Sequence, residues 1–253
     1  MAILYTPCTY KMQMTMSWII GVDVGGTFTD FYGSDTASGD YVVHKTASTP
    51  DNPARAIADG LKEMCAEHGI SAADVVRLGH GTTVGTNTLI QRRGAPVALI
   101  TTRGFRDLLE IGRQTRPHMF DMQVDRPEPL VPRELRLEVT ERVLATGQVL
   151  RDIDEADVEK AVEAVAKSDV EACAVCFLFS FLDPAHERAV GEALRKARPD
   201  LFISLSSEVQ PEFREYERLS TMVLNAYLQP VISKYLDYLE KTVGKDLIAG
   251  PIG

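Results

Sequence analysis

Residues 19–30 read Ile-Ile-Gly-Val-Asp-Val-Gly-Gly-Thr-Phe-Thr-Asp, an apolar run that leads into an acidic residue, a glycine pair and two threonines. The apolar residues predict a buried strand with Asp23 near its end, where a carboxylate can hold Mg²⁺ directly or through water. Gly25 and Gly26 let the backbone turn tightly and bring bare N–H groups against phosphate oxygens. The stretch therefore predicts a phosphate site.

The residues after the glycine pair add polar groups to this predicted site. Thr27 and Thr29 can donate hydroxyl hydrogen bonds, and Asp30 offers a second carboxylate for metal binding or acid/base chemistry. The spacings of a P-loop and of a Rossmann dinucleotide site are both absent. The alternative is a β-hairpin whose glycine pair only makes the turn, because glycine-rich turns are common.

The composition is that of an α/β globular protein. The chain has 253 residues, 45% of them hydrophobic and 25% charged, which is enough for one large core or two smaller ones. Its formal net charge of −9 argues against a nucleic-acid surface, since phosphate backbones select basic patches. No apolar run reaches the length of about 18 residues that a membrane span needs. Residues 1–17 lack the pattern of a secretory signal, so we expect a leader without fixed structure and a cytoplasmic location.

The spacing Cys173-x-x-Cys176 raises the question of a metal or redox site. Both residues lie in the apolar run 172–181, which we predict to be a buried strand. Strand alternation would place the two thiols on opposite faces, and no second pair completes a set of four ligands. We therefore expect buried, reduced cysteines.

Alternating elements are predicted along the first half of the chain. The helix at 52–68 is well bounded, because Pro53 suits its first turn and Gly69 its end. The other predicted elements are strands at 18–24, 30–34 and 41–46 with a hairpin turn at 38–40, a strand at 75–80, a helix at 85–93 and a strand at 97–101.

The second half begins with a proline-rich segment, 113–133, which predicts an extended loop. After it we predict a hairpin at 138–144 and 148–150, a helix at 154–167, a strand at 173–181, a helix at 184–198, a strand at 202–206, and a helix at 213–243 that is interrupted near Pro230.

The segment Gly79–Asn87 is a second candidate site, because a strand ends there in Gly-His-Gly-Thr-Thr just before a helix. Open α/β sheets bind ligands where strands end beside helix N-termini. His80 could act on a substrate or ligate a metal, and Thr82, Thr83 and Asn87 could bond to a substrate. The alternative for His80 is a structural imidazole at a tight turn.

Two further groups of charged residues are candidates of a different kind. Arg113 and Arg116 in the proline-rich loop could hold a carboxylate or a phosphate through paired hydrogen bonds, although a solvated loop explains them equally well. The run Glu212–Arg218 alternates Glu and Arg at a helix start, where local ion pairing is a sufficient explanation.

At this point the motifs carry a family resemblance. The string Asp23–Thr27 resembles the first phosphate motif of the superfamily that joins sugar kinases, heat-shock chaperones and actin. The longer string 21–30 resembles the hydantoinase A, 5-oxoprolinase and acetone carboxylase β-subunit family more narrowly. The segments that match that family in order are 79–87, 102–114, 212–221 and 225–230.

The resemblance implies an α/β fold, a ribonuclease H-like, actin-type ATPase lobe with a mixed sheet and flanking helices. It implies an N-terminal ATPase-like region at 18–206, a helical segment at 207–244 that begins the next domain, and a tail at 245–253. Relatives use ATP and Mg²⁺ to phosphorylate a cyclic amide oxygen before ring opening, or a ketone enol before carboxylation.

The same resemblance implies roles for single residues. Asp23 would position Mg²⁺, with Asp30 and His80 as further catalytic groups. The expected phosphate contacts are Gly25, Gly26, Thr27 and Thr29, and the expected substrate contacts are Thr82, Thr83, Asn87, Arg113 and Arg116.

Family members are considerably longer, and their second phosphate loop lies beyond the part matched here. We therefore expect an N-terminal fragment, a truncated gene product or a subunit that another chain completes. The resemblance implies a hydantoinase B-type partner subunit or domain, with a cyclic amide or ketone as the small-molecule substrate. The alternative is a non-catalytic docking lobe that a partner chain completes.

Overall fold

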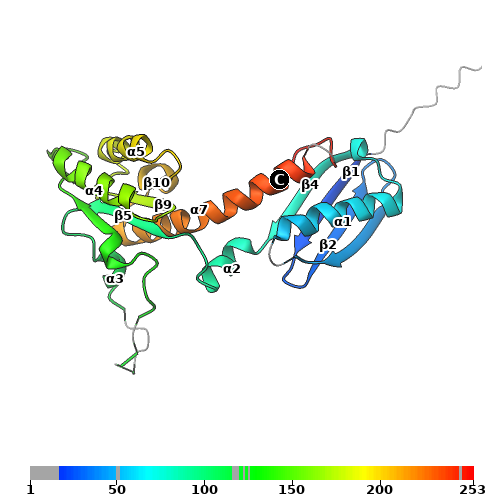
Figure 1. Ribbon diagram of the computed structural model, residues 1–253, viewed down its shortest axis with the longest axis horizontal. Helices are drawn as coiled ribbons and strands as arrows, with labels where there is room; N and C mark the ends of the chain where they lie inside the picture. The colour runs from blue at the N-terminus through cyan, green and yellow to red at the C-terminus, as the bar shows by residue number, and fades with distance from the viewer. Residues whose placement is uncertain (1–16, 50–51, 116–119, 122, 125, 245–246) are drawn as a thin grey trace, which may run out of the picture. The chain divides into compact units, whose positions relative to one another are not determined.

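The computed structural model describes residues 17–49, 52–115, 120–121, 123–124, 126–244 and 247–253 (Figure 1). The predicted leader lies outside the described residues, except for Ser17. The chain forms two compact units, one from the residues up to Val84 together with Lys234–Gly253, the other from Gly85–Ser233. The domain limits expected from the sequence stay predictions.

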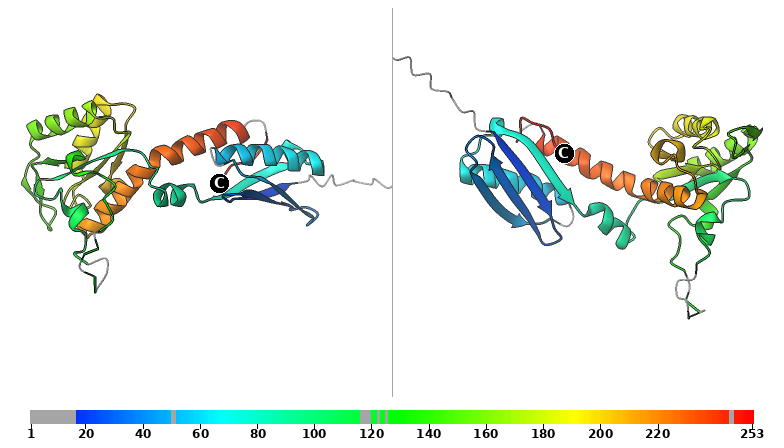
Figure 2. Two further views of the ribbon diagram at one scale, coloured as in Figure 1. Left: turned by 60° about the horizontal axis from the view of Figure 1, so that its bottom comes forward. Right: turned by 180° about the vertical axis from the view of Figure 1, so that it is seen from behind.

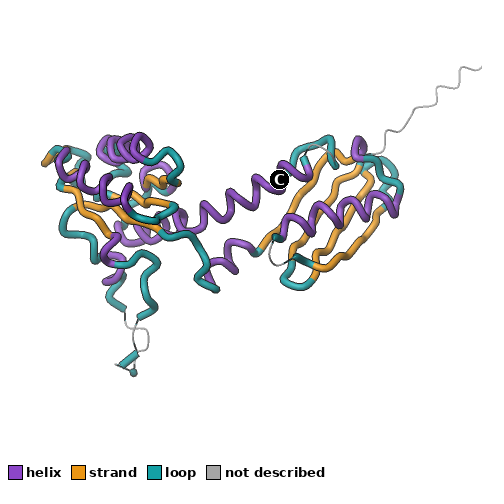
Figure 3. Tube along the Cα trace, in the orientation of Figure 1, coloured by secondary structure: helices purple, strands orange, loops and turns teal. Residues whose placement is uncertain are grey.

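The first unit is built on a mixed four-stranded sheet with the order β3-β2-β1-β4 (Figure 3). Its strands are β1 (Trp18–Val24), β2 (Phe28–Asp35), β3 (Tyr41–Ala47) and β4 (Val75–Thr82). The first three strands are antiparallel neighbours, and β4 is parallel to β1. The strands and the hairpin turn predicted for this segment are confirmed, as is the mixed α/β fold class.

One face of this sheet is buried, because alternate residues of β1 are apolar and point to the same side. Helix α1 (Pro53–His68) covers that face together with Tyr235, Leu239 and Val243 from the last turns of α7 (Glu215–Val243). Figure 2 shows both helices on the same side of the sheet. Pro53 starts α1, and Gly69 ends it with a left-handed φ of 66°, as predicted. Within the described part of the first unit, no helix covers the other face.

The last described residues, 249–253, extend this sheet beside β4. The N–H groups of Leu78 and His80 donate to the carbonyl oxygens of Pro251 and Gly253 over 3.1 and 2.9 Å. The segment runs parallel to β4, so it occupies the position of a fifth strand.

The second unit contains a parallel sheet with the order β10-β9-β5-β6. Its strands are β5 (Val97–Thr102), β6 (Arg136–Val139), β9 (Ala172–Cys176) and β10 (Phe202–Leu205). Helices α4 (Glu155–Lys167) and α5 (Ala185–Ala197) pack on one face, and the first turns of α7 pack on the other. Cys173 and Cys176 are buried free thiols on opposite faces, which confirms the prediction for this pair.

Short elements complete the described chain. They are η1 (Ala72–Asp74), α2 (Val84–Ile90), α3 (Leu108–Ile111), η2 (Arg133–Leu135), β7 (Arg142–Val143), β8 (Val149–Arg151) and α6 (Ser206–Val209).

Three predicted elements were wrong in part. The strand at 173–181 ends at Cys176, because the chain turns through Phe179, whose φ is 57°. Residues 136–139 pair with β5 as β6, so the predicted hairpin strand begins only at Arg142. Helix α7 passes through Pro230 without interruption. Its buried residues in both units stabilise it against the loss of one hydrogen bond.

A buried polar network holds the start of α7 against the second sheet. The Glu187 carboxylate accepts hydrogen bonds from the Phe177 and Ser207 N–H groups and from the Ser206 hydroxyl, over 2.9, 2.8 and 2.6 Å. The guanidinium of Arg218 donates to the same Ser206 oxygen and to the Phe177 carbonyl. Both charged side chains are fully buried, so the local ion pairing expected for the helix start is replaced, at Arg218, by a long-range network.

Candidate functional site

Three charged side chains form a row across the face of the first sheet that no described helix covers, which we call the open face. Asp23 lies directly opposite Asp30 in the β1–β2 register, and Asp30 lies opposite Lys45 in the β2–β3 register. All three are exposed, and the Lys45 Nζ is 2.7 Å from an oxygen of Asp30. Two opposed carboxylates repel each other unless a cation lies near them, and Lys45 supplies one such charge to Asp30.

Beside this row the backbone of the open face is not covered by side chains, because the outward positions are glycines; we call this area the glycine floor. Gly21 on β1 and Gly79 and Gly81 on β4 occupy the outward positions nearest Asp23, so no side chain rises there. A shallow cavity of about 830 Å³ covers this floor, with Tyr32 among its walls. A ligand can therefore reach the backbone of both strands.

The two glycines of the first turn meet different surroundings. Gly25 donates its N–H to the Phe28 carbonyl, and a Cβ at Gly25 would lie 2.8 Å from that oxygen, so the turn itself requires glycine. A Cβ at Gly26 would meet nothing within 4 Å. The hairpin that the sequence allowed as an alternative is present, but it does not account for Gly26. The open space over Gly26 fits a phosphate that approaches the backbone.

The two threonines of the motif point to opposite sides. Thr27 is exposed beside Gly26, whereas Thr29 is fully buried and its hydroxyl lies 3.0 Å from the Ser48 hydroxyl. Ser48 in turn donates to the Gly25 carbonyl over 2.7 Å. Thr29 therefore stabilises the turn through Ser48 on the buried side, whereas the hydroxyl of the exposed Thr27 can reach a ligand.

His80 lies on the covered face of the sheet, because it alternates with Gly79 and Gly81 along β4. Its ring centroid is 5.6 Å from that of Tyr235, and its Nδ1 atom is buried without a hydrogen-bond partner. Burial lowers the pKa of His80, so the imidazole is neutral at neutral pH. Thr82 accepts the N–H of Val84 at the start of α2. The structure does not bring these side chains to the face that carries Asp23.

The other predicted substrate contacts are distributed along the chain. Thr83 follows β4, Asn87 lies on α2, and Arg113 follows α3, where its Nε donates to Glu217 over 2.8 Å. Arg116 lies outside the described residues. Asn87 and Arg113 belong to the second unit, whereas the residues predicted to contact phosphate belong to the first.

The donor set on the open face fits Mg²⁺ held jointly with phosphate. Among the described residues no group of three or more His, Cys, Asp and Glu side chains is arranged to hold a metal. Mg²⁺ is usually bound by one or two carboxylates and completes its octahedron with water and substrate phosphates. Asp23 and Asp30 supply such a pair.

Sequence reasoning missed Lys45 and Ser48. Neither stands in the glycine-rich motif, and both come to it only through the β2–β3 register and the residues just after β3. The predicted hairpin turn at 38–40 could have revealed Lys45, because pairing the strands outward from that turn places Lys45 opposite Asp30.

Comparisons with known proteins identify the family of this chain. The model of the hydantoinase/oxoprolinase N-terminal region matches residues 19–198. The caprolactamase subunit alpha of Pseudomonas jessenii is 36% identical over 227 residues, which are 87% of this chain and 32% of that protein. The acetophenone carboxylase gamma subunit of Aromatoleum aromaticum is 34% identical over 229 residues, 83% of this chain and 31% of that protein.

A solved structure extends the likeness to three dimensions. The crystal structure of the ATP-dependent caprolactamase from Pseudomonas jessenii superposes with a TM-score of 0.84 at 35% identity, over 92% of this chain and 35% of that one. The chain thus spans about a third of the length of these relatives. No helix of the described residues is both long enough and apolar enough to cross a membrane. The ordered motifs, the fold and these matches together show that the chain belongs to the hydantoinase/oxoprolinase N-terminal region family.

Proposed function

We propose that the first unit is the phosphate-binding half of an ATP site, in an enzyme that phosphorylates a cyclic amide oxygen or a ketone enol oxygen. The observation that carries the proposal is the row Lys45–Asp30–Asp23 beside a glycine floor and the open Gly26. Backbone N–H groups, a lysine and a carboxylate pair are what a Mg²⁺–triphosphate requires on one surface.

The chemistry explains why ATP would be used. Transfer of a phosphoryl group to the oxygen of a cyclic amide makes its carbon more electrophilic and turns that oxygen into a good leaving group. Transfer to the oxygen of a ketone's enol instead holds the enol form, whose carbon can then bond to a carboxyl donor while the phosphoryl group is released to water. Mg²⁺, when bound, would offset the charge on the phosphate oxygens. Asp23 and Asp30 would hold the metal, and Gly26 and Thr27 would contact phosphate.

The remaining predicted contacts keep a proposed role in substrate binding, with one change. Thr83, Asn87, Arg113 and Arg116 stay candidates for substrate contacts. His80 faces the covered side of the sheet, and we assign it to the junction between β4 and the segment 249–253.

A second candidate function is a docking lobe that a partner chain completes, as in the multi-subunit enzymes to which the relatives' names refer. The open face of the first sheet favours it, because Tyr32, Tyr41 and Val43 are 52%, 67% and 64% exposed. Exposed apolar side chains that gather on one face often mark a protein interface. A hydantoinase B-type subunit is the partner we propose, and the two functions are compatible in one hetero-oligomeric enzyme.

The test is Asp23→Asn in the complete enzyme, with Asp59→Asn on the exposed side of α1 as the matched control. We expect Asp23→Asn to lower Mg²⁺-dependent ATP turnover by about a hundredfold or more while circular dichroism stays unchanged. The Asp59→Asn enzyme should keep its turnover. Unchanged turnover in Asp23→Asn would remove Asp23 from the mechanism, and an unmodified enzyme that binds its partner but not ATP would favour the docking lobe.

A further inference from the structure

The second unit contains a cavity that the proposed ATP site does not use. It lies between the first turns of α7, the end of α3, and the chain segments 112–115 and 126–130, and its volume is about 830 Å³. Apolar side chains form much of its wall, among them Leu89, Leu109 and Leu130. Cavities of this size and character are typical of small-molecule sites.

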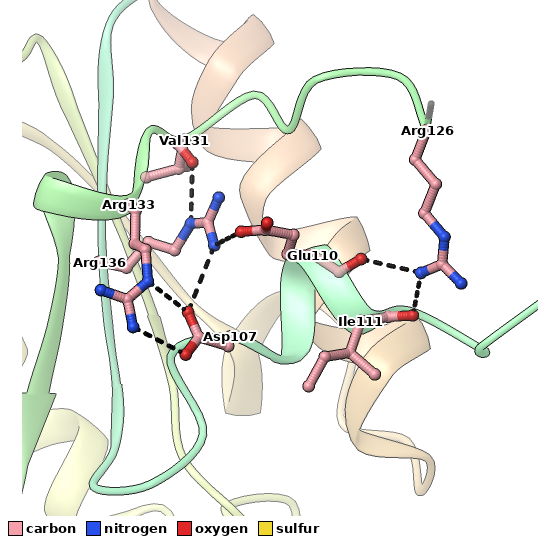
Figure 4. Close-up of polar contacts among 7 residues, drawn as sticks. All are labelled: Asp107, Glu110, Ile111, Arg126, Val131, Arg133 and Arg136. Carbon is pink, nitrogen blue, oxygen red and sulfur yellow. Dashed lines mark hydrogen bonds and ion pairs between the residues drawn. The ribbon is translucent and has the colours of Figure 1, made fainter. Parts of the chain in front are cut away.

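The wall of this cavity is held in place by ion pairs and by one arginine. Figure 4 shows Arg126 reaching the end of α3, where its guanidinium donates to the carbonyl oxygens of Glu110 and Ile111. The same guanidinium also donates to the carbonyl oxygen of Thr115. The carboxylate of Glu110 is 2.9 Å from Arg136, whose side chain is buried. These bonds tie the two chain segments to α3, so the cavity is formed before any ligand enters.

A planar cation lies at the rim of the cavity. Arg113 donates from Nε to Glu217 over 2.8 Å, and its guanidinium carbon lies 6.0 Å from the centre of the Tyr216 ring. Its Nη1 and Nη2 atoms make no hydrogen bond to any described residue, and its side chain is 64% exposed. The fork of a guanidinium matches a carboxylate, and an exposed ion pair such as Arg113–Glu217 contributes little, so a second carboxylate can join it.

The charges around the cavity limit what this cation can accept. Glu110 and Glu128 are part of the lining, and Glu217 already contacts Arg113. Arg126 also lines the cavity and Glu110 pairs with Arg136, so Glu217 is the carboxylate that acts directly on Arg113. That carboxylate repels a dianion such as phosphate more strongly than a monoanion. The apolar wall favours a ligand with a hydrocarbon body.

We propose that this cavity binds a small organic monoacid, with its apolar body against Leu109 and Leu130 and its carboxylate on Arg113. Such an acid can be a carboxylate-bearing substrate or an acid that acts as an effector. The proposal deepens the substrate-binding role that the proposed function gives to Arg113, and because binding does not need ATP, it can fail while the ATP site stands.

The first experiment titrates the 253-residue chain without nucleotide, using calorimetry and methyl NMR. The probes are cyclohexanecarboxylate and its neutral isostere cyclohexanecarboxamide. We expect the acid to bind at least tenfold more tightly and to shift the methyl signals of Leu109 and Leu130, while those of Ile57 in the first unit stay unchanged. Equal binding of acid and amide would overturn the proposal.

Two variants and a control separate the effect of the Arg113 charge from the effect of the space inside the cavity. Arg113→Gln should remove the preference for the acid, whereas Arg93→Gln, an exposed arginine outside the cavity lining, should not. Ser220→Trp, which places a large ring in the cavity, should abolish binding of both probes. Unchanged binding in either cavity variant would contradict the assignment. Asp23→Asn should leave the titration unaltered, because it acts only on the ATP site.

Competition then identifies the source of the acid. Displacement of the probe by 5-oxoproline, a cyclic amide with a carboxylate, would assign the cavity to substrate. Displacement by open-chain acids but not by 5-oxoproline would assign it to an effector, and displacement by neither would overturn the proposal.

Discussion

Gly25 and Gly26 are adjacent in the first turn, but the surrounding atoms exclude a Cβ at only one of the two positions. Gly25 is needed by the turn, since a Cβ would press against the Phe28 carbonyl at 2.8 Å. Gly26 has open space around it and does not adopt a left-handed φ. A glycine that the turn itself does not require is informative, because it leaves the backbone open to a ligand.

Alanine substitutions at these two positions should therefore separate stability from function. Gly25→Ala should lower the free energy of unfolding by about 1–3 kcal/mol, because the added methyl group forces the backbone apart. Gly26→Ala should change it by less than about 0.5 kcal/mol. It should nevertheless weaken ATP binding by the complete enzyme about tenfold or more, because the methyl group takes the place of a phosphate oxygen. Urea titrations and nucleotide titrations measure the two effects, and normal ATP binding by Gly26→Ala would favour the simple hairpin.

Asp157 in the first turn of α4 predicts a pH dependence of stability. Hydrogen bonds from Thr140 and from the Arg103 guanidinium lower the pKa of this carboxyl from 3.8 to about 2. A carboxyl whose pKa is lower in the folded state stabilises the protein above the pKa of the unfolded chain, and that contribution is lost as the pH falls through the folded value. Asp157→Asn should therefore reduce stability at pH 7, and its difference from the unmodified protein should shrink between about pH 4 and pH 2.

Urea titrations at a series of pH values measure this difference. Asp152→Asn, an exposed carboxylate in the segment before α4, is the matched control. A difference that stays constant down to pH 2 would show that Asp157 acts through packing and not through its charge.

At the scale of elements, local signals predicted helices better than strand partners. Helix α1 was predicted within one residue, because Pro53 and Gly69 mark its ends. The strand β6 was missed because its partner β5 lies 37 residues earlier in the paired register, Leu99 with Arg136, and nothing local reports such a pairing. Phe179 was assigned to a strand because an apolar run does not reveal a residue with a φ of 57°.

The segment 249–253 gives the clearest prediction at this scale. A Cβ at Gly250 would lie 1.7 Å from the Val76 carbonyl oxygen, so alanine cannot be accommodated while the segment stays beside β4. Gly250→Ala should detach the segment and destabilise the first unit by about 1–2 kcal/mol. Hydrogen exchange of the Leu78 and His80 amides should become faster, because their acceptors leave.

Gly253→Ala is the matched control, since the nearest atom to its Cβ would be 4.0 Å away, at the end of a flexible arginine. Its exchange rates should equal those of the unmodified protein. Slow exchange at Leu78 in the Gly250→Ala protein would mean that the segment contributes little to the sheet.

At the scale of the whole molecule, the sequence predicted the glycine turn after β1 and the family, and the structure showed which side chains surround that turn. Asp23, Gly26 and Thr27 lie where the motif suggested, because a strand, a turn and a strand are local. Lys45 joins them through a register that depends on two strands together, and His80 turned out to face the other side. Sequence alternation alone does not reveal which face of β4 a helix covers.

One helix belongs to both units, and the chain of the first unit is interrupted by the whole of the second. Residues 85–233 lie between β4 and the residues that complete the first core, Tyr235, Leu239 and Val243. During synthesis the ribosome must therefore deliver all of the second unit before the first can close its sheet and core. The turn at Gly25 and Gly26, although encoded near the beginning of the described chain, lies in the unit whose core needs residues 235–243, so a nascent chain cannot complete the core beneath this turn until almost every described residue has been made.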